Sequence, residues 1–490
     1  MESDLKSSFR KSVKWTATVS LFNTITQPVY RVFLAILLLP SEYAYIAVIT
    51  LIVSLAELLN NVGVGEAVIQ RDKVFPEDIS TLFYFNLFLS IAFSVLTYSS
   101  ASLLEQFYDM TSLSIIVKIL SVVVFMNGAT SLFKFYLHKN FMFNKTSVIK
   151  LVKLFLEIVI SIILIVIGLN IYGYVIGVVL ANIVHSILLV ISAFKYTDFK
   201  LKLYFSFNKL KSFLEFGIFV GLKKIITFVS QRADEIIVGG ALSSEVLGTY
   251  FLAKTILVQI QTLITSSFGQ VLLPTFSKLK HNFSEMKKFY LQVIKIVAYF
   301  GIPMFVFIML SAEHFVVVFL GQEWSAAIIV FEWLAIPTLC LLLSAGITTS
   351  LLYAVNKTKV VLLVDLILVP VYLFLLYILH SGSLINILII YSSYIMIKFI
   401  LIQVILSNIF GIKIREVLKN IKSIIVSVFI TVLIIMLIKN YLNRHDDIMS
   451  LTIYSLISFM IYFIVTLIFN RDDTIKYINL VKSTLTLKGK

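Results

Sequence analysis

Cysteine and charge are both scarce in this sequence. Its single cysteine, Cys340, cannot form a disulfide within the chain of 490 residues. Charged residues make up 14% of the chain and hydrophobic residues 59%. Soluble globular domains have about 25% charged and about 45–50% apolar residues. This composition excludes a soluble enzyme, and it equally excludes a disordered or fibrous protein.

Motifs for catalysis and nucleotide binding are also missing. The chain contains no G-x-x-x-x-G-K-[ST] loop for ATP, no G-x-S-x-G nucleophile turn and no H-E-x-x-H zinc motif. Its histidines are scattered without the spacing of a metal site. We therefore expect no enzyme activity, no cofactor and no metal site.

Long apolar runs dominate what is present. A membrane-spanning helix takes about 20 apolar residues, and the runs predict about fourteen such helices. The expected fold class is therefore an all-α, polytopic membrane protein. The predicted spans are 13–39, 43–66, 79–104, 111–137, 147–168, 171–194, 213–241, 244–273, 288–310, 325–354, 359–379, 383–406, 421–439 and 449–469.

Basic residues predict the orientation of the chain. Nearly all the Lys and Arg of the connections fall in one alternate set of loops and in the two termini, whereas the opposite connections hold only Lys439 and Arg444. Because Lys and Arg collect on the cytoplasmic side of membrane proteins, we expect both termini in the cytoplasm. This topology accounts for the net charge of +15 without nucleic acid as a partner.

A weak internal repeat predicts the domain organisation. Residues 40–43 (PSEY) join the first two spans, and residues 243–246 (SSEV) join the seventh and eighth in the same way. This predicts two lobes of six helices each, related by a pseudo-two-fold axis along the membrane normal, with the substrate site between them. The expected parts are an N-terminal lobe (1–194), a cytoplasmic inter-lobe linker (195–212), a C-terminal lobe (213–406) and two extra helices with a cytoplasmic tail (407–490).

Six ordered segments resemble a known transporter family. They are residues 38–43 (LLPSEY), 63–71 (GVGEAVIQR), 78–83 (DISTLF), 232–239 (RADEIIVG), 247–250 (LGTY) and 273–277 (LPTFS). Together they are similar to the polysaccharide transporter, or Wzx-like, branch of the multidrug/oligosaccharidyl-lipid/polysaccharide exporters of bacteria. One departure is Ala44, where the family prefers glycine, and it predicts a looser turn.

The resemblance implies a flippase. Such proteins translocate undecaprenyl-diphosphate-linked oligosaccharide, a repeat unit of O-antigen, capsule, exopolysaccharide or teichuronic-acid type, across the bacterial cytoplasmic membrane by alternating access. The implied partners are the lipid-linked oligosaccharide and membrane lipids, with a polysaccharide polymerase and export machinery as further partners. The alternative function is an ion-coupled multidrug or organic-cation exporter of the same superfamily.

Charges inside the predicted spans mark the candidate substrate site. A lipid-exposed charge near mid-bilayer costs about 2.5–3.5 kcal/mol, and five of them exceed the stability of an ordinary domain. They therefore face a water-filled cavity or pair with acids. A cationic cavity would offset the desolvation of a diphosphate, and arginine binds phosphate bidentately. The candidates are Arg31, Lys223, Lys224, Arg232 and Lys254.

Buried acids offer a second interpretation of the same region. Glu57, Glu157, Asp234 and Glu235 can couple transport to protons or Na⁺, or can form salt bridges with the cations. The two pairings considered are Arg232 with Glu235, one helical turn apart, and Arg31 with Glu57. The sign of the charge in the cavity distinguishes a flippase for an anionic lipid from an exporter of organic cations. Neutralising Arg31, Arg232 and Lys254 should abolish transport of an anionic lipid and spare efflux of cations.

Overall fold

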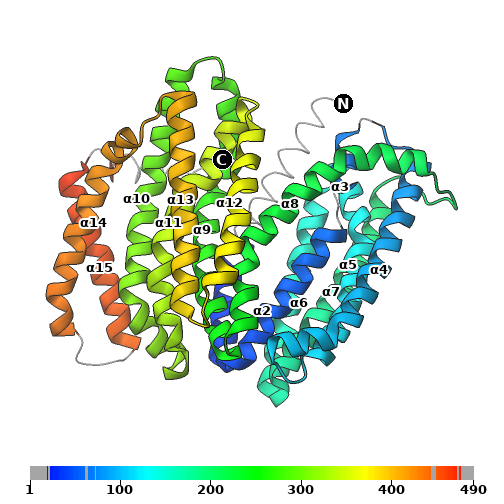
Figure 1. Ribbon diagram of the computed structural model, residues 1–490, viewed down its shortest axis with the longest axis horizontal. Helices are drawn as coiled ribbons and strands as arrows, with labels where there is room; N and C mark the ends of the chain where they lie inside the picture. The colour runs from blue at the N-terminus through cyan, green and yellow to red at the C-terminus, as the bar shows by residue number, and fades with distance from the viewer. Residues whose placement is uncertain are drawn as a thin grey trace. The chain divides into compact units, whose positions relative to one another are not determined.

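The computed structural model describes residue 19 and residues 22–60, 64–71, 73–442, 448–471 and 474–475. Throughout these residues the regular secondary structure is helical (Figure 1). The beginning of the first predicted span, Gly63 of the second motif and most of the predicted cytoplasmic tail lie outside the described residues. The long helices are residues 22–37, α2 (Pro40–Asn60), α4 (Pro76–Tyr108), α5 (Leu113–Lys139), α6 (Phe143–Leu164), α7 (Asn170–Tyr196), α8 (Phe207–Ala241), α9 (Ser244–Leu279), α10 (Phe283–Phe315), α11 (Ala326–Ala354), α12 (Thr358–Leu379), α13 (Leu384–Phe410), α14 (Ile414–Leu442) and α15 (Ile448–Phe469).

The all-α polytopic fold class is confirmed, and each predicted span overlaps one of these helices. Within the described part of the chain, 10 helical segments are long and apolar enough to cross a membrane. Helix α8 is not among them, since its charged residues include Lys223, Lys224, Arg232 and three acids. The number of about fourteen spans therefore stays a prediction.

The second predicted span, 43–66, overlaps α2 and the beginning of the short helix α3 (Val64–Gln70). Residues 61–63 between them lie outside the described residues.

The chain divides into two compact units, Met1–Leu252 and Ala253–Lys490. The first unit holds the helices up to α8 together with the beginning of α9, and the second holds the remainder of α9 and α10–α15. The predicted boundaries of the lobes, the linker and the pseudo-two-fold axis stay predictions.

Helices α6 and α7 form a tight antiparallel hairpin in the first unit. The chain reverses after the π-helical segment η1 (Ile165–Leu169), where Gly168 has a φ of 99°. A Cβ atom on Gly173 would lie 2.8 Å from the backbone nitrogen of Ile165, and one on Gly177 would lie 2.9 Å from that of Ser161. The two glycines therefore let the helix backbones approach closely, as small residues do in membrane helix pairs.

The connection between α7 and α8 is fixed to the start of α4. The carboxylate of Asp78 accepts a hydrogen bond from the Phe75 amide at 3.0 Å and pairs with Lys209 at 2.9 Å. The hydrogen bond to Asp78 raises the pKa of the Lys209 ammonium. The hydroxyl of Ser80 accepts from the Lys202 amide at 2.8 Å. Residues of the 78–83 motif therefore hold the predicted linker in place.

The motif of residues 63–71 also packs against neighbouring helices. A Cβ atom on Gly65 would overlap the ring of Phe135 on α5. The guanidinium of Arg71 lies 3.6 Å from the ring centroid of Phe213 on α8 and donates to the Ser212 hydroxyl at 2.6 Å. Both motif residues thus serve packing between helices.

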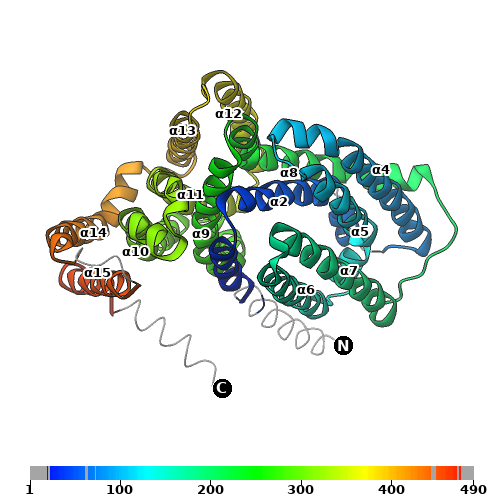
Figure 2. The ribbon, with the colours of Figure 1, turned by 90° about the horizontal axis from the view of Figure 1, so that it is seen from below.

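In the second unit α14 packs along α10, and α15 packs against both (Figures 1 and 2). Lys287 of α10 pairs with Glu416 of α14 at 2.7 Å, and Asn420 donates to the Leu291 carbonyl at 2.7 Å. The Tyr462 hydroxyl of α15 donates to a carbonyl of α10 at 2.8 Å. Polar contacts therefore fix the extra C-terminal helices to α10.

The α6–α7 hairpin gives a stability prediction. We expect Gly177→Ala to lower stability by about 1–3 kcal/mol, because the added methyl group forces two packed backbones apart. Thermal unfolding of the purified protein in detergent measures the change. Gly346→Ala is the matched control, since the nearest described side chain to its Cβ atom would be Thr265 at 4.0 Å. Equal Tm values for Gly177→Ala and the wild type would contradict the close packing.

Candidate functional site

An ion pair lies on the last third of α8. The Nη1 atom of Arg232 donates to both carboxylate oxygens of Glu235, at 3.0 and 2.7 Å. The Glu235 residue is only 3% exposed, and Arg232 is half-buried. Of the two interpretations considered for Arg232, the ion pair with Glu235 is formed in the structure, and the charge of Arg232 is balanced at short range.

A second buried carboxylate joins α8 to the start of α9. Asp234 is fully buried and accepts a hydrogen bond from the hydroxyl of Tyr250, which is itself fully buried. Asp234 belongs to the RADE segment, and Tyr250 ends the LGTY segment. The hydrogen bond explains why a carboxylate and a tyrosine occur together in this pattern, because a buried carboxylate requires a donor.

Glycines bring the motif segments of the first unit together. A Cβ atom on Gly248 would lie 2.8 Å from the carbonyl carbon of Pro40 and 3.2 Å from the Ala44 nitrogen. The beginnings of α9 and α2 therefore approach at backbone contact. Gly239 of α8 lies against the Tyr108 ring in a similar way. The LPSEY, RADEIIVG and LGTY segments thus converge at one end of this unit.

Arg31 lies beside this convergence. It is 9% exposed, and its guanidinium carbon lies 5.8 Å from the ring centroid of Phe251. The Tyr43 ring packs at 6.2 Å from that of Phe251, and the Tyr43 hydroxyl donates to the Arg31 carbonyl at 3.3 Å. Two guanidinium nitrogens of Arg31, Nε and Nη1, are buried without a hydrogen-bond partner in the described part of the chain. Such unmade hydrogen bonds to a charged group are costly.

The expected pair between Arg31 and Glu57 is not formed among the described residues. Glu57 is exposed and accepts a hydrogen bond from Asn127 of α5 at 3.4 Å. Glu157 of α6 is half-buried and lies within electrostatic reach of Arg31, and the Tyr174 hydroxyl of α7 lies close to the guanidinium. Arg31 is therefore surrounded mainly by aromatic side chains, and the acid Glu157 lies farther away.

The three lysines of the candidate site have different positions. Lys223 and Lys224 are half-buried near the middle of α8. Lys254 belongs to the second unit, where it is 5% exposed and its Nζ lies 5.0 Å from the ring centroid of Tyr391. Within the first unit Arg31 lies beside Tyr43, and Arg232 pairs with Glu235, whereas Glu157 lies on α6, outside the motif segments.

Sequence reasoning missed the aromatic residues around the cations. No short spacing in the sequence connects Arg31 with its aromatic neighbours Tyr43 and Phe251. The same holds for Lys254 and its neighbour Tyr391. It also missed the ion pair between Lys398 of α13 and Asp365 of α12, because snorkelling explained the lysine equally well. Opposite charges on neighbouring apolar helices were the available signal. No group of residues suited to a metal ion was found among the described positions.

Comparison with known proteins gives a family match. The family described as "Polysaccharide biosynthesis protein" matches residues 33–329. The teichuronic acid biosynthesis protein TuaB of Bacillus subtilis is 25% identical over 327 residues, which are 66% of each chain. The lipopolysaccharide biosynthesis protein WzxC of Escherichia coli is 21% identical over 325 residues, 66% of this chain and 65% of that protein. The match thus spans about two thirds of the length of these relatives.

Solved structures show the fold. The lipid II flippase MurJ, in an inward closed conformation, has a TM-score of 0.75 at 16% identity, with 95% of this chain and 99% of that chain covered. A multidrug resistance MATE family transporter in an inward-facing conformation has a TM-score of 0.61 at 17% identity, covering 80% and 98%. A MATE family transporter in an outward-facing conformation has a TM-score of 0.52 at 16% identity, covering 82% and 96%. The predicted resemblance is confirmed.

The ion pair on α8 gives a testable coupling. We expect Arg232→Gln to destabilise the protein by about 2 kcal/mol, because it leaves the buried Glu235 carboxylate without its partner. Adding Glu235→Gln should recover part of that loss, with a coupling of about 1 kcal/mol or more in a double-mutant cycle. Thermal unfolding of the four proteins in detergent measures the cycle. Strictly additive losses would contradict a stabilising pair.

Proposed function

The chain belongs to the polysaccharide biosynthesis protein family, and from that membership we propose that it is a flippase for lipid-linked oligosaccharide. It translocates an undecaprenyl-diphosphate-linked repeat unit across the bacterial cytoplasmic membrane by alternating access. The similarity to TuaB, WzxC and the MurJ fold supports this proposal. The MATE transporters of similar fold, captured facing inward and outward, support the alternating mechanism.

The observation that carries the proposal is the state of Arg31. A buried guanidinium with two unpartnered N–H-bearing nitrogens is prepared to bind an acceptor with negative charge. A phosphate group supplies both the charge and several acceptor oxygens, and it suits the planar fork of arginine. We assign Arg31 as the primary diphosphate ligand of the translocation site.

The other candidate cations contribute less directly to phosphate binding in this proposal. Lys223, Lys224 and Lys254 add positive charge that offsets the desolvation of the diphosphate as it crosses the bilayer. Arg232 is already paired with Glu235 at 2.7 Å, so it contributes only when a phosphate competes with that carboxylate. This competition gives the substrate a way to change the contacts between α8 and its neighbours.

The acids have the complementary role. Glu157 is half-buried and lies within electrostatic reach of Arg31, so binding of a proton or Na⁺ there would strengthen the attraction of Arg31 for phosphate. Glu57 is an exposed second candidate, whereas Asp234 and Glu235 are held by Tyr250 and Arg232 as structural partners. The energy source in this scheme is an ion gradient or the membrane potential.

The proposed setting follows from the same function. Both termini face the cytoplasm, as the distribution of basic residues predicts. The flipped oligosaccharide is passed to a polysaccharide polymerase and export machinery. The membrane lipids hold the prenyl chain while the charged and sugar parts cross within the protein.

Lipid extraction from a depleted strain tests the function. We expect undecaprenyl-diphosphate-linked oligosaccharide to accumulate on the cytoplasmic leaflet while surface polysaccharide falls. The trapped sugar would identify the substrate. Unchanged lipid-linked sugar and unchanged surface polysaccharide, in a strain with no second flippase, would contradict the proposal.

Substitution of Arg31 tests the assigned ligand. We expect Arg31→Gln to reduce surface polysaccharide at least tenfold in the depleted strain, because the diphosphate loses its main counter-charge. Arg31→Lys should be intermediate, since it keeps the charge and loses the bidentate geometry. Arg415→Gln, at an exposed position on α14, is the control and should complement fully. Full complementation by Arg31→Gln at normal protein levels would show that Arg31 is not a ligand of the diphosphate.

A further inference from the structure

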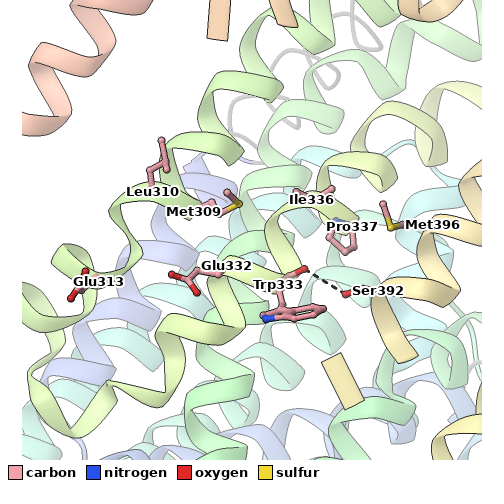
Figure 3. A pocket seen from close by; sticks show the side chains of 9 residues that line it. All are labelled: Met309, Leu310, Glu313, Glu332, Trp333, Ile336, Pro337, Ser392 and Met396. Atoms are coloured by element: carbon pink, nitrogen blue, oxygen red, sulfur yellow. Dashed lines mark hydrogen bonds between the residues drawn. The ribbon is translucent and has the colours of Figure 1, made fainter. Parts of the chain in front are cut away.

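The second unit contains a groove whose lining includes none of the candidate cations. It lies between α10, α11 and α13 and has a volume of about 550 Å³ (Figure 3). Helix α11 packs against both of the other helices, so the walls belong to one packed structure. Pockets of about 300–1,000 Å³ accommodate small organic molecules, and this volume is far larger than a bare metal ion requires.

Polar and apolar groups are separated along the groove. Glu332 lies six residues into α11, and Glu313 lies seven residues before Leu320, where the helical chain of α10 ends. At about 1.5 Å per residue, both carboxylates are therefore about 10 Å from the same end of the bundle. The apolar side chains of Met309, Ile336 and Met396 lie deeper, and Figure 3 shows them above the two carboxylates.

The acids make the groove complementary to a cation. Both glutamates are exposed, and the Glu332 carboxylate has no ion pair or hydrogen bond with any described residue of the chain. Carboxylates at membrane depth are costly unless water or an opposite charge reaches them. A positively charged occupant would remove that cost at Glu332.

An aromatic ring next to the acids narrows the class of cation that the groove can bind. Trp333 lines the groove and is 41% exposed. Tryptophan has the strongest attraction for cations among aromatic side chains, and pockets for quaternary ammonium groups use it. Methionine adapts to apolar bodies of different shape. We propose that this groove binds a lipophilic organic ammonium ion, with the ammonium beside Glu332, Glu313 and Trp333 and its apolar body along Met309 and Met396.

Equilibrium dialysis of the full-length protein tests the proposal. The probe is radiolabelled octyltrimethylammonium, measured against the protein in uncharged maltoside micelles, with empty micelles subtracted. We expect saturable binding that weakens at least tenfold in Glu332→Gln and severalfold in Trp333→Leu. Glu323→Gln is the matched control, because Glu323 is an exposed acid on η3 (Gln322–Trp324), near the same end of the bundle and outside the groove lining. It should bind the probe like the wild type.

Two results would overturn the proposal. One is equal binding by wild type and Glu332→Gln at unchanged Tm. The other is equal displacement of the probe by octanol and by unlabelled octyltrimethylammonium, which would show that only the alkyl chain is recognised. The experiment contains no lipid-linked sugar, so its result is independent of the flippase function. A variant that fails to fold is replaced by Glu332→Asp, for which we expect binding to be retained but weakened.

Discussion

A charge removed from water requires an opposite charge or a hydrogen-bond acceptor, and this constraint organises the polar interior of the protein. Arg232 satisfies it with Glu235, and Lys398 with Asp365. Lys254 packs against an aromatic ring at 5.0 Å. Arg31 satisfies it incompletely, since two of its nitrogens are without an acceptor in the described part of the chain. The proposed function, which brings a diphosphate into the membrane, would give one cation a reason to be kept in this state.

The motif segments at one end of the first unit lie beside that cation. Gly248 and Pro40 bring the beginnings of two helices into backbone contact, and Tyr250 fixes Asp234 between them. At the opposite end of the unit, Asp78 and Arg71 hold the connection before α8. These residues position helices, and none of them needs to contact the substrate. Their order along the chain therefore identifies the family, whereas Arg31, the proposed phosphate ligand, lies just outside the motifs.

The sequence predicted the helices well because each follows a long apolar run that must be solvated by lipid. It predicted the pair of Arg232 and Glu235 because residues three apart share a helix face. It did not predict the surroundings of Arg31. Glu57 turns toward Asn127, and helices that are apolar on every face give no signal for their rotation about the axis. The groove with Glu332 was equally hidden, since its walls come from three helices distant in sequence.

Direct transport in proteoliposomes tests the central claim. Purified protein is reconstituted with undecaprenyl-diphosphate-linked oligosaccharide on the inner leaflet, and a non-permeant glycosidase outside reports the sugar that has crossed. The account predicts protein-dependent exposure of the sugar well above that of empty liposomes, and its loss in Arg31→Gln. Equal exposure with and without the protein, under an imposed ion gradient, would contradict it.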